Sequence, residues 1–322
     1  MLANNGCSVI VGIPTFNAES TIIETLQSLK NQTYKDFKVL IADNNSTDST
    51  VALIEAFAWD RVQVVVHEKN ITALGNFDYL ISACSDYDFI AIYHSDDLYH
   101  QEMLESSIKQ FQCSDVLVVS TGCNEIDQKG VITRDFVGTG KTFNLSFSVL
   151  FSRILSQSAP FLVTPSIMFR KTDELLNIKY SNSRYRSASD YYFVFELIRF
   201  SGYICYIDKP LINYRIHSGQ GSQSEIRKNL NIPDGLLLYA DYISDSFEVH
   251  FPLFMEKQYK LVAHLVLKCI AENEWSLARG FLALLYARSA KEHACKFILR
   301  AAVFFNLPIP VDALLKIRKI LK

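Results

Sequence analysis

Short apolar runs and amphipathic segments alternate along the first 125 residues. The apolar runs predict strands over residues 7–13, 37–42, 62–67, 89–93 and 116–121. Between them, apolar positions recur at helical spacing and predict helices over residues 19–31, 49–59, 72–84 and 101–111. Because strand and helix alternate through short polar links, we expect an α/β fold with a mostly parallel, doubly wound, Rossmann-like sheet.

The pattern becomes less regular after residue 125. It predicts a helix over residues 141–158, a strand over 161–170, a polar loop over 181–189, a helix over 190–200 and extended segments over 203–207 and 211–216. Beyond Gly221 the spacing is predominantly helical, and Gly, Ser and Gln cluster over residues 219–224. We therefore expect a boundary near residue 222, between a domain over 1–222 and a helical C-terminal region over 223–322.

Composition and charge bound the class of protein. Of the 322 residues, 49% are hydrophobic and 20% are charged, which is typical of a globular protein with a substantial core. The formal net charge is −2, but residues 281–322 carry eight Lys or Arg against two acidic residues. A basic, apolar tail of this kind suits an anionic membrane surface better than nucleic acid. The alternative is a terminal helix that packs on its own domain.

Cysteine usage and hydropathy indicate the compartment. The seven cysteines are scattered, odd in number and without C-x-x-C pairing, as expected of reduced thiols in a cytoplasmic protein. The first residues lack the basic start and apolar core of a signal peptide, and no run reaches the roughly 18 apolar residues of a membrane-spanning helix. We expect a cytoplasmic protein that is either soluble or peripheral on the inner face of the cell membrane.

The strand predicted over residues 89–93 ends directly in His94-Ser95-Asp96-Asp97. Carboxylates in this position lie at the carboxyl edge of the sheet, where open α/β folds bind ligands. Two adjacent acids without basic neighbours repel each other, so they favour binding of a divalent cation such as Mg²⁺ or Mn²⁺. The alternative is that Asp96 or Asp97 caps the helix predicted to follow.

Polar residues also follow two other strands of the predicted sheet. Residues 14–17 end the first strand, and the segment that starts with Asp43-Asn44 follows the second. The three strand ends should meet at one edge, where a nucleotide would bind. The sequence contains neither G-x-G-x-x-G nor a P-loop motif, so we expect a metal ion rather than a glycine-rich loop to neutralise phosphate.

In this order, the motifs resemble those of the inverting nucleotide-sugar glycosyltransferases of family 2, which have the GT-A fold. The resemblance is carried by residues 9–17, 29–37 and 42–50 and by the Asp96-Asp97 pair. Weaker landmarks follow in family order at residues 165–170, 189–190 and 214–219. The resemblance covers residues 7–222 and implies a nucleotide-sugar half over 1–125 and an acceptor half over 126–222.

The resemblance implies roles for individual residues. Asp97 would be the main ligand of Mn²⁺ or Mg²⁺, and Asp96 would contact the metal and the ribose or donor sugar. The other donor-binding residues would be Pro14, Thr15, Phe16 and Asn17 around the base pocket, Asp43 and Asn44 reading the base, Lys69, and His217 at the diphosphate or metal. For Lys69 and His217 the alternatives are a solvated lysine and a structural histidine.

This sequence departs from the family pattern at three places. Asn44 replaces the second acid of the base-reading pair, and an amide oxygen accepts a base N–H without the charge of a carboxylate. His94 replaces an acid that often opens the four-residue motif. An arginine common after the third strand is absent, with Gly75-Asn76 near its place, and Lys69 would supply the missing positive charge.

Asp190 corresponds to the family's catalytic base, just after a polar loop and before an aromatic-rich helix. The alternative is a helix-opening acid stabilised by the helix dipole. The two interpretations are compatible, because a helix N-terminus favours the ionised carboxylate that a general base requires. Arg184 and Arg186 flank Tyr185 in the loop and would clamp the acceptor, unless the loop is simply solvated.

The residues and the resemblance together predict metal-dependent, inverting transfer of a sugar from a nucleoside diphosphate sugar, of UDP or dTDP type, to a hydroxyl of a glycan or lipid-linked glycan. Family habit places such an enzyme in bacterial cell-surface polysaccharide synthesis of the O-antigen or capsule type. Two alternatives remain: a catalytically inactive sugar-nucleotide or carbohydrate-binding module, and a glycoside hydrolase that uses two carboxylates. We expect no nucleic-acid partner.

Overall fold

The computed structural model describes residues 7–156, 162–181, 183–217, 231–243, 247–271, 273, 275–285, 290–305, 309 and 317. The chain forms two compact units: Met1–Leu150 with Pro160–Arg227, and Phe151–Ala159 with Lys228–Lys322. The boundary predicted near residue 222 lies outside the described residues. The second unit includes a segment, Phe151–Ala159, that the sequence pattern did not separate from the first.

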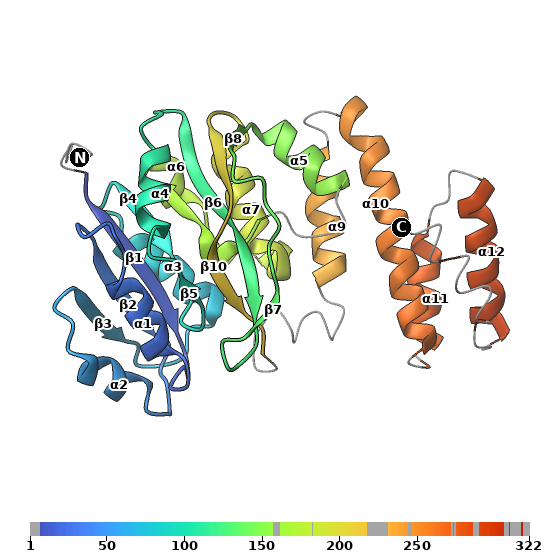
Figure 1. Cartoon of the computed structure of the whole chain (residues 1–322). Coiled ribbons are helices and arrows are strands. Elements are labelled where there is room, and N and C mark those ends of the chain that lie inside the picture. Colours follow the sequence, from blue (N-terminus) through green and yellow to red (C-terminus); the bar gives the residue numbers. More distant parts are fainter. Residues whose placement is uncertain are drawn as a thin grey trace. The chain divides into compact units, whose positions relative to one another are not determined.

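The first unit is built on one ten-stranded sheet, whose first part is parallel (Figure 1). This part consists of β1 (Val9–Thr15), β2 (Lys38–Asp43), β3 (Val62–Val66) and β4 (Phe89–Ile92). The strands lie in the order β3-β2-β1-β4, and each neighbouring pair is parallel. The four apolar runs of the N-terminal half therefore form strands as predicted, each within two residues of the predicted bounds.

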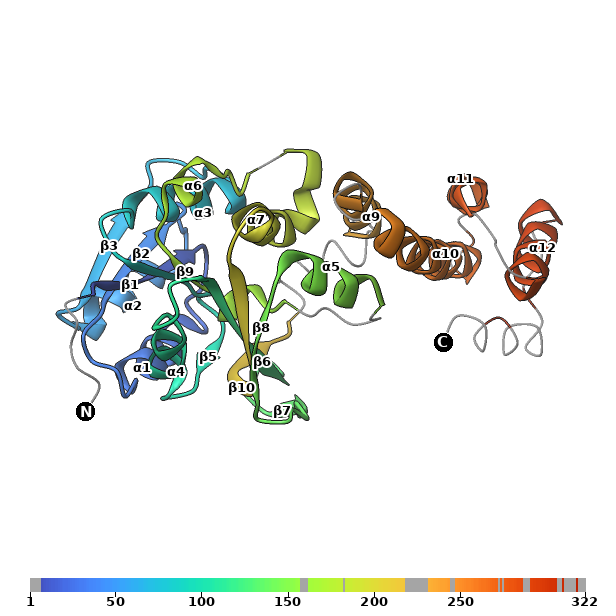
Figure 2. The same ribbon diagram turned by 90° about the horizontal axis from the view of Figure 1, so that it is seen from above.

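Helices cover both faces of this parallel part (Figure 2). They are α1 (Ile22–Lys30), α2 (Thr50–Phe57), α3 (Ala73–Ala83) and α4 (Met103–Gln110). α1 buries Ile22, Leu26 and Leu29 in the core that also contains alternate residues of β1. α3 covers the opposite face, where a Cβ at Gly12 would lie 3.2 Å from Leu80, so the close approach of α3 to β1 favours glycine.

The second part of the sheet is mixed. It contains β5 (Leu98–Tyr99), β6 (Val116–Ile126), β7 (Ile132–Arg134), β8 (Thr142–Leu145), β9 (Met168–Arg170) and β10 (Tyr203–Arg215). β9 lies antiparallel between β4 and β6, and β10 runs parallel to β6 but antiparallel to β5 and β8. The α/β class with a central sheet is confirmed, and the antiparallel strands lie in the half predicted to be less regular.

Three assignments in this half are wrong. The predicted helix over 141–158 starts with a strand, because Thr142–Leu145 pairs with β10, and α5 (Phe147–Ser156) follows it. Within the strand predicted over 161–170, Pro165 lies in a 3-10 turn, η1 (Thr164–Ser166), and β9 starts at Met168. The two extended segments around Pro210 are one strand, and register shifts on both sides of Pro210 accommodate its missing N–H.

Short helical elements connect the last strands of the first unit. α6 (Asp173–Asn177) begins after Thr172, whose hydroxyl accepts a hydrogen bond of 3.1 Å from the amide of Leu175. The polar loop predicted over 181–189 contains a 3-10 segment, η2 (Ser183–Ala188). η2 leads into α7 (Ser189–Ile198), which buries Phe193 and Leu197 and matches the helix predicted over 190–200.

The second unit is helical. It contains α9 (Asn231–Tyr242), α10 (Phe247–Ala271), α11 (Trp275–Leu284) and α12 (Ala290–Phe305). Tyr259, Val262 and Val266 on α10 form a core with Ala278 on α11 and Leu299 on α12. The helical C-terminal region is thus confirmed over these residues. Apart from residues 309 and 317, the basic segment 306–322 lies outside the described residues.

None of the helices in the described part of the chain has the length and the apolar character that crossing a lipid bilayer requires.

Candidate active site

The carboxyl ends of β1, β2 and β4 lie side by side. In the parallel register, Thr15 is opposite Asp43 and Gly12 is opposite Ile92. The carbonyl of Thr15 accepts a hydrogen bond of 2.8 Å from the amide of Asn44, which connects the two polar strand ends. The structure therefore brings the three strand ends together at the edge where open α/β folds bind ligands.

Contacts with α1 and with two tyrosines hold the motif over residues 94–97 in place. The hydroxyl of Thr25 on α1 donates to the carbonyls of Ser95 and Asp97, at 3.1 and 2.9 Å. The rings of Tyr93 and Tyr99 stack with their centroids 4.1 Å apart. These contacts leave the motif little freedom, so its side chains are held in place before any ligand binds.

The helix-cap alternative for Asp96 and Asp97 is wrong. β5 follows the two acids directly, and α4 begins only at Met103, with Glu102 at its N-cap position. The two carboxylates are therefore available for a role other than satisfying the amides of a following helix.

Asp97 is fully buried. Its Oδ1 accepts a hydrogen bond of 2.8 Å from the backbone amide of Arg215, whereas its Oδ2 has no hydrogen-bond partner among the described residues. Burial, and then the negative charge of Asp96, raise the pKa of Asp97 well above its usual range, and Arg215 opposes them. Because a buried carboxylate oxygen without a partner is costly, a cation beside Oδ2 would stabilise the ionised form.

Two histidines lie beside the acid pair. His217 Nε2 is 3.0 Å from Asp96 Oδ2, and His94 Nδ1 is 3.9 Å from Asp97 Oδ2. Ligand atoms of His94, Asp96 and Asp97 all lie within 4.8 Å of one another. Burial lowers the pKa of His94, which favours the neutral imidazole that can bind a metal. Carboxylates with neutral imidazoles suit Mn²⁺, and the carboxylates also suit Mg²⁺, so the residues fit the expected ion.

Arg215 connects this corner to two other segments, a role that the sequence pattern did not reveal. Its side chain is 2% exposed and donates to the carbonyls of Asp96 and Gln128, at 2.7 and 2.9 Å. It also pairs with Glu24 on α1 at 2.6 Å. Glu24 lies 191 positions away in the sequence, so no local pattern could have identified the contact.

Replacement of Arg215 by methionine is expected to lower the free energy of unfolding by about 3–5 kcal/mol, because it leaves buried carbonyl groups without donors. Urea unfolding of the full chain measures this loss. Glu24→Gln is the matched control, since Glu24 is 58% exposed and its ion pair should contribute less than about 1 kcal/mol. Equal losses in the two variants would contradict the role assigned to Arg215.

Asp43 and Asn44, predicted to read the base, are both buried and already bonded within the protein. The two carboxylate oxygens of Asp43 accept from the amide and the hydroxyl of Ser46, at 2.8 and 2.5 Å. Asn44 accepts from the amide of Ile71 at 2.8 Å and donates to Asn70 at 3.2 Å. These bonds fix both side chains, and each oxygen keeps a second lone pair for a base N–H.

The loop after β1 carries the other residues predicted around the base pocket. Pro14 and Thr15 end the strand, and the ring of Phe16 is 49% exposed, so one face is open for stacking. Asn17 has a left-handed backbone with φ of 49°, and its side-chain oxygen accepts from the amide of Thr47 at 2.9 Å. The loops after β1 and β2 therefore support each other.

Lys69 and Asn76 lie in the region where the family arginine is missing. Lys69 is exposed in the loop before α3, so its predicted contact with the donor stays a prediction. Asn76 is buried, donates to the carbonyl of Ala42 at 2.7 Å and pairs with His67 Nε2 at 2.9 Å. Sequence reasoning assigned no role to Asn76, which joins the ends of β2 and β3 to α3.

Asp190 lies in the first turn of α7. Its Oδ2 accepts from the hydroxyl of Thr164 at 2.6 Å, and its Oδ1 accepts from the amide of Tyr191 at 2.9 Å. Burial raises the pKa of Asp190, and both hydrogen bonds oppose that rise because they favour the ionised carboxylate. The position is that of a helix-opening acid and equally of a base held ready to accept a proton.

The acceptor clamp predicted from the loop before Asp190 stays a prediction. Arg184 is exposed, and its guanidinium lies 5.8 Å from the centroid of the Tyr185 ring. The side chain of Arg186 lies outside what the structure describes.

A mixed α/β sheet with an acid pair at its carboxyl edge is the arrangement of a nucleotide-sugar-dependent transferase. Residues 10–176, more than half of the chain, match the model of Glycosyl transferase family 2. The chain therefore belongs to glycosyltransferase family 2.

Two curated relatives each match part of the chain. EpsE of Bacillus subtilis is 30% identical over 133 residues, which is 38% of this chain and 45% of EpsE. The UDP-Glc:alpha-D-GlcNAc-diphosphoundecaprenol beta-1,3-glucosyltransferase WfgD of Escherichia coli is 29% identical over 137 residues, which is 42% of this chain and 53% of WfgD. The chain spans about half the length of these two relatives.

A solved structure extends the comparison to the fold. Staphylococcus aureus TarS, residues 1–349 in complex with UDP-GlcNAc, superimposes with a TM-score of 0.55 at 17% sequence identity. The superposition covers 93% of this chain and 89% of that one. At this identity the likeness shows the fold alone, and it confirms the GT-A fold with C-terminal helices.

Proposed function

We propose that this chain transfers a sugar from a nucleoside diphosphate sugar to a hydroxyl of a glycan acceptor, with inversion at the anomeric carbon. The observation that carries the proposal is the buried Asp97, whose Oδ2 is unpartnered among the described residues and lies beside His94 at the carboxyl edge of the sheet. Residues 1–125 would bind the donor and residues 126–222 the acceptor.

The donor would be a UDP-sugar or, as the alternative, a dTDP-sugar. The printed name of WfgD gives UDP-Glc as its donor, and the TarS structure contains UDP-GlcNAc. Asp97 and Asp96, with His217 and His94 beside them, would hold Mn²⁺ or Mg²⁺. When bound, such an ion offsets the charge that develops on the departing nucleoside diphosphate. Phe16 would stack on the base, and Asp43 and Asn44 would present oxygens to its N–H groups.

Asp190 would act as the general base. The acceptor oxygen forms a bond to the anomeric carbon while the bond from that carbon to the diphosphate oxygen breaks, and the diphosphate takes the electron pair. The acceptor proton passes to the Asp190 carboxylate. Attack from the face opposite the diphosphate inverts the anomeric configuration, and fixed placement of both substrates lowers the entropic part of the barrier.

The acceptor would be a glycan, including lipid-linked glycans of the kind used in bacterial cell-surface polysaccharide synthesis. The name of WfgD includes a diphosphoundecaprenol-linked acceptor, which supports this class. Residues 281–322, with eight Lys or Arg against two acidic residues, would contact the anionic inner face of the membrane peripherally from the cytoplasm.

A panel of nucleotide sugars tests the proposal. One donor should raise the melting temperature of the full chain in the presence of Mn²⁺ and not in its absence, because a ligand that binds only the folded state stabilises it. The same donor should then release nucleoside diphosphate when a glycan acceptor is added. Binding without release would favour the inactive binding module, and metal-independent cleavage of a glycan would favour the glycoside hydrolase.

A further inference from the structure

The Asp190 carboxylate accepts a hydrogen bond from a hydroxyl whose own position is fixed by other contacts. Thr164, which donates to Asp190 at 2.6 Å, opens the 3-10 turn η1. Two residues on, the hydroxyl of the fully buried Ser166 accepts from the amide of Thr121 at 3.1 Å and pairs with the hydroxyl of Ser120 at 3.0 Å. Because both partners lie on β6, the central sheet fixes the position of η1 and hence of the Thr164 hydroxyl.

An aromatic side chain packs against α7, the helix that carries Asp190. This side chain, Tyr180, is buried. Its ring stacks on Phe77 of α3, with centroids 4.8 Å apart and planes at 12°, and packs against Phe193 of α7 at 4.9 Å. Phe77 also lies edge-on to His94 at 5.8 Å, so the same aromatic group contacts the acid motif.

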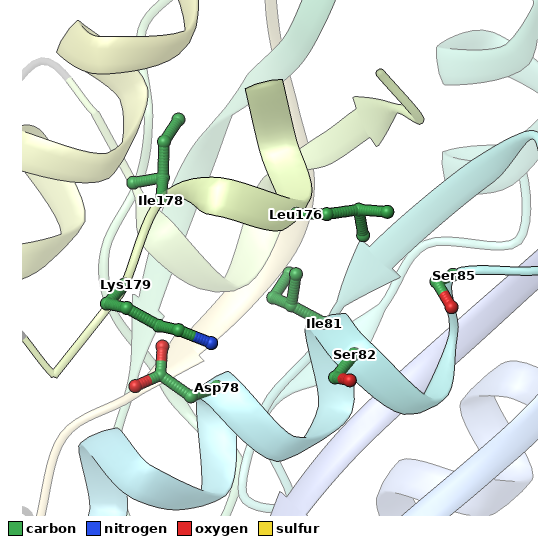
Figure 3. Close-up of a pocket in the computed structure, with 7 residues that line it drawn as sticks. All are labelled: Asp78, Ile81, Ser82, Ser85, Leu176, Ile178 and Lys179. Carbon is green, nitrogen blue, oxygen red and sulfur yellow. The ribbon is translucent and has the colours of Figure 1, made fainter. Parts of the chain in front are cut away.

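The backbone of Tyr180 is also anchored. Asp78 on α3 accepts from the amides of Tyr180 and Ser181, at 2.6 and 3.2 Å. Figure 3 shows Asp78 on α3 beside the segment with Ile178 and Lys179, at a small cavity of about 90 Å³. Both the ring and the main chain of Tyr180 are therefore fixed.

The number of available protons decides which group donates in the hydrogen bond between Thr164 and Asp190. An ionised carboxylate only accepts, so the single hydroxyl proton of Thr164 is used toward Asp190. The Thr164 hydroxyl is therefore the donor in this bond, and the bond favours the ionised form of Asp190.

We propose that Thr164 is a positioning residue that holds the Asp190 carboxylate in one orientation and in its ionised form, ready to take the acceptor proton. The inference rests on the proposed role of Asp190 as general base. The bond to Oδ2 and that of the Tyr191 amide to Oδ1 fix the plane of the carboxylate, and each oxygen retains a free lone pair for the acceptor.

Among the described residues, several titratable or charged side chains lie in the region of Asp190. Burial raises the pKa of the Tyr180 phenol in the segment before η2, and the charges of Asp190 and of Asp78 on α3 raise it as well. Lys179 lies beside Asp78, and Arg184 is exposed on η2. Since burial raises the pKa of Asp190 and the Thr164 bond lowers it, removal of that bond should raise the pKa further.

The pH profile of transfer tests the inference. A base must be deprotonated to act, so kcat/KM falls as the pH drops through its pKa. In the Thr164→Val variant the acid limb should move up by about 1–2 pH units, because a hydrogen bond to an ionised group is lost. Thr164→Ser, which keeps the hydroxyl, should show the wild-type profile.

The control is a second threonine–aspartate pair. The hydroxyl of Thr139 donates to Asp208 at 2.6 Å, the same distance as in the Thr164 pair, on an exposed loop. Thr139→Val should leave the acid limb and the donor dissociation constant unchanged. Thr164→Val should likewise leave donor binding unchanged. A general loss of structure would weaken donor binding, so this measurement distinguishes the two.

The outcomes separate the inference from the function on which it rests. An inactive Asp190→Asn variant together with an unmoved limb in Thr164→Val would overturn the positioning role and leave Asp190 as the base. Full activity in Asp190→Asn would overturn both. If Thr164→Val does not fold, the limb in Thr164→Ala decides the matter, because alanine also removes the hydroxyl and is smaller than valine.

Discussion

Replacement of Asp190 by asparagine is expected to lower kcat by roughly 100- to 10,000-fold, the usual contribution of a general base. Asparagine keeps the shape of the side chain and its oxygen still accepts from Thr164, but the amide cannot take the acceptor proton. Donor binding should be unchanged, since Asp190 lies on α7 and not on the loops after β1, β2 and β4. Initial rates at saturating donor, with calorimetry of donor binding, measure both quantities.

Asp173→Asn is the matched control for this experiment. Asp173 also lies in the first turn of a helix, α6, and is exposed. If the contribution of Asp190 were only to stabilise a helix N-terminus, both variants would lose a similar small amount of stability and neither would lose turnover. Retained turnover in Asp190→Asn would remove the residue from the catalytic role.

Replacement of Asp97 by asparagine is expected to weaken Mn²⁺-dependent donor binding by more than about 100-fold, since loss of a direct ligand should exceed the effect of losing an outer contact. The backbone amide of Arg215 can still donate to the asparagine oxygen, so the fold is preserved. Calorimetry with a nucleoside diphosphate, with and without Mn²⁺, measures the effect. Asp86→Asn, which changes an exposed acid of the same unit, serves as the control.

Asp97→Asn should weaken donor binding, but it should not lower the stability of the metal-free protein. The pKa of Asp97 is raised in the folded protein, so its contribution to stability is present below the unfolded value of about 4 and is lost as the pH rises through the folded pKa. In metal-free buffer at neutral pH, Asp97→Asn should therefore be at least as stable as the wild type. A variant that unfolds more easily than the wild type under these conditions would contradict this picture.

The fold of the N-terminal half could be predicted because its signals are local. The apolar runs of β1 to β4 are bounded by polar turns, and Ile22, Leu26 and Leu29 recur at helical spacing. The second half depends on distant pairing. Thr142–Leu145 is a strand because β10 lies beside it, and that partner is far away in the sequence.

The residues of the candidate site also fall into two groups, those with a local sequence signal and those that depend on distant contacts. Asp96, Asp97 and Asp190 were identifiable because each follows or opens a predicted element. Arg215 and Asn76 were not, since Arg215 pairs with Glu24, 191 positions away, and Asn76 donates to Ala42, 34 positions away, and their local context resembles ordinary strand and helix sequence. Thr164 was hidden for the same reason: the residue that it contacts, Asp190, is 26 positions further along the chain.

Anomalous diffraction from crystals of the full chain soaked with UDP and Mn²⁺ tests most directly whether Asp97 holds the metal. We expect one manganese peak within bonding distance of the Asp97 carboxylate, in contact with the diphosphate. UDP bound at this edge of the sheet with no manganese at Asp97, or manganese bound only elsewhere, would contradict this expectation.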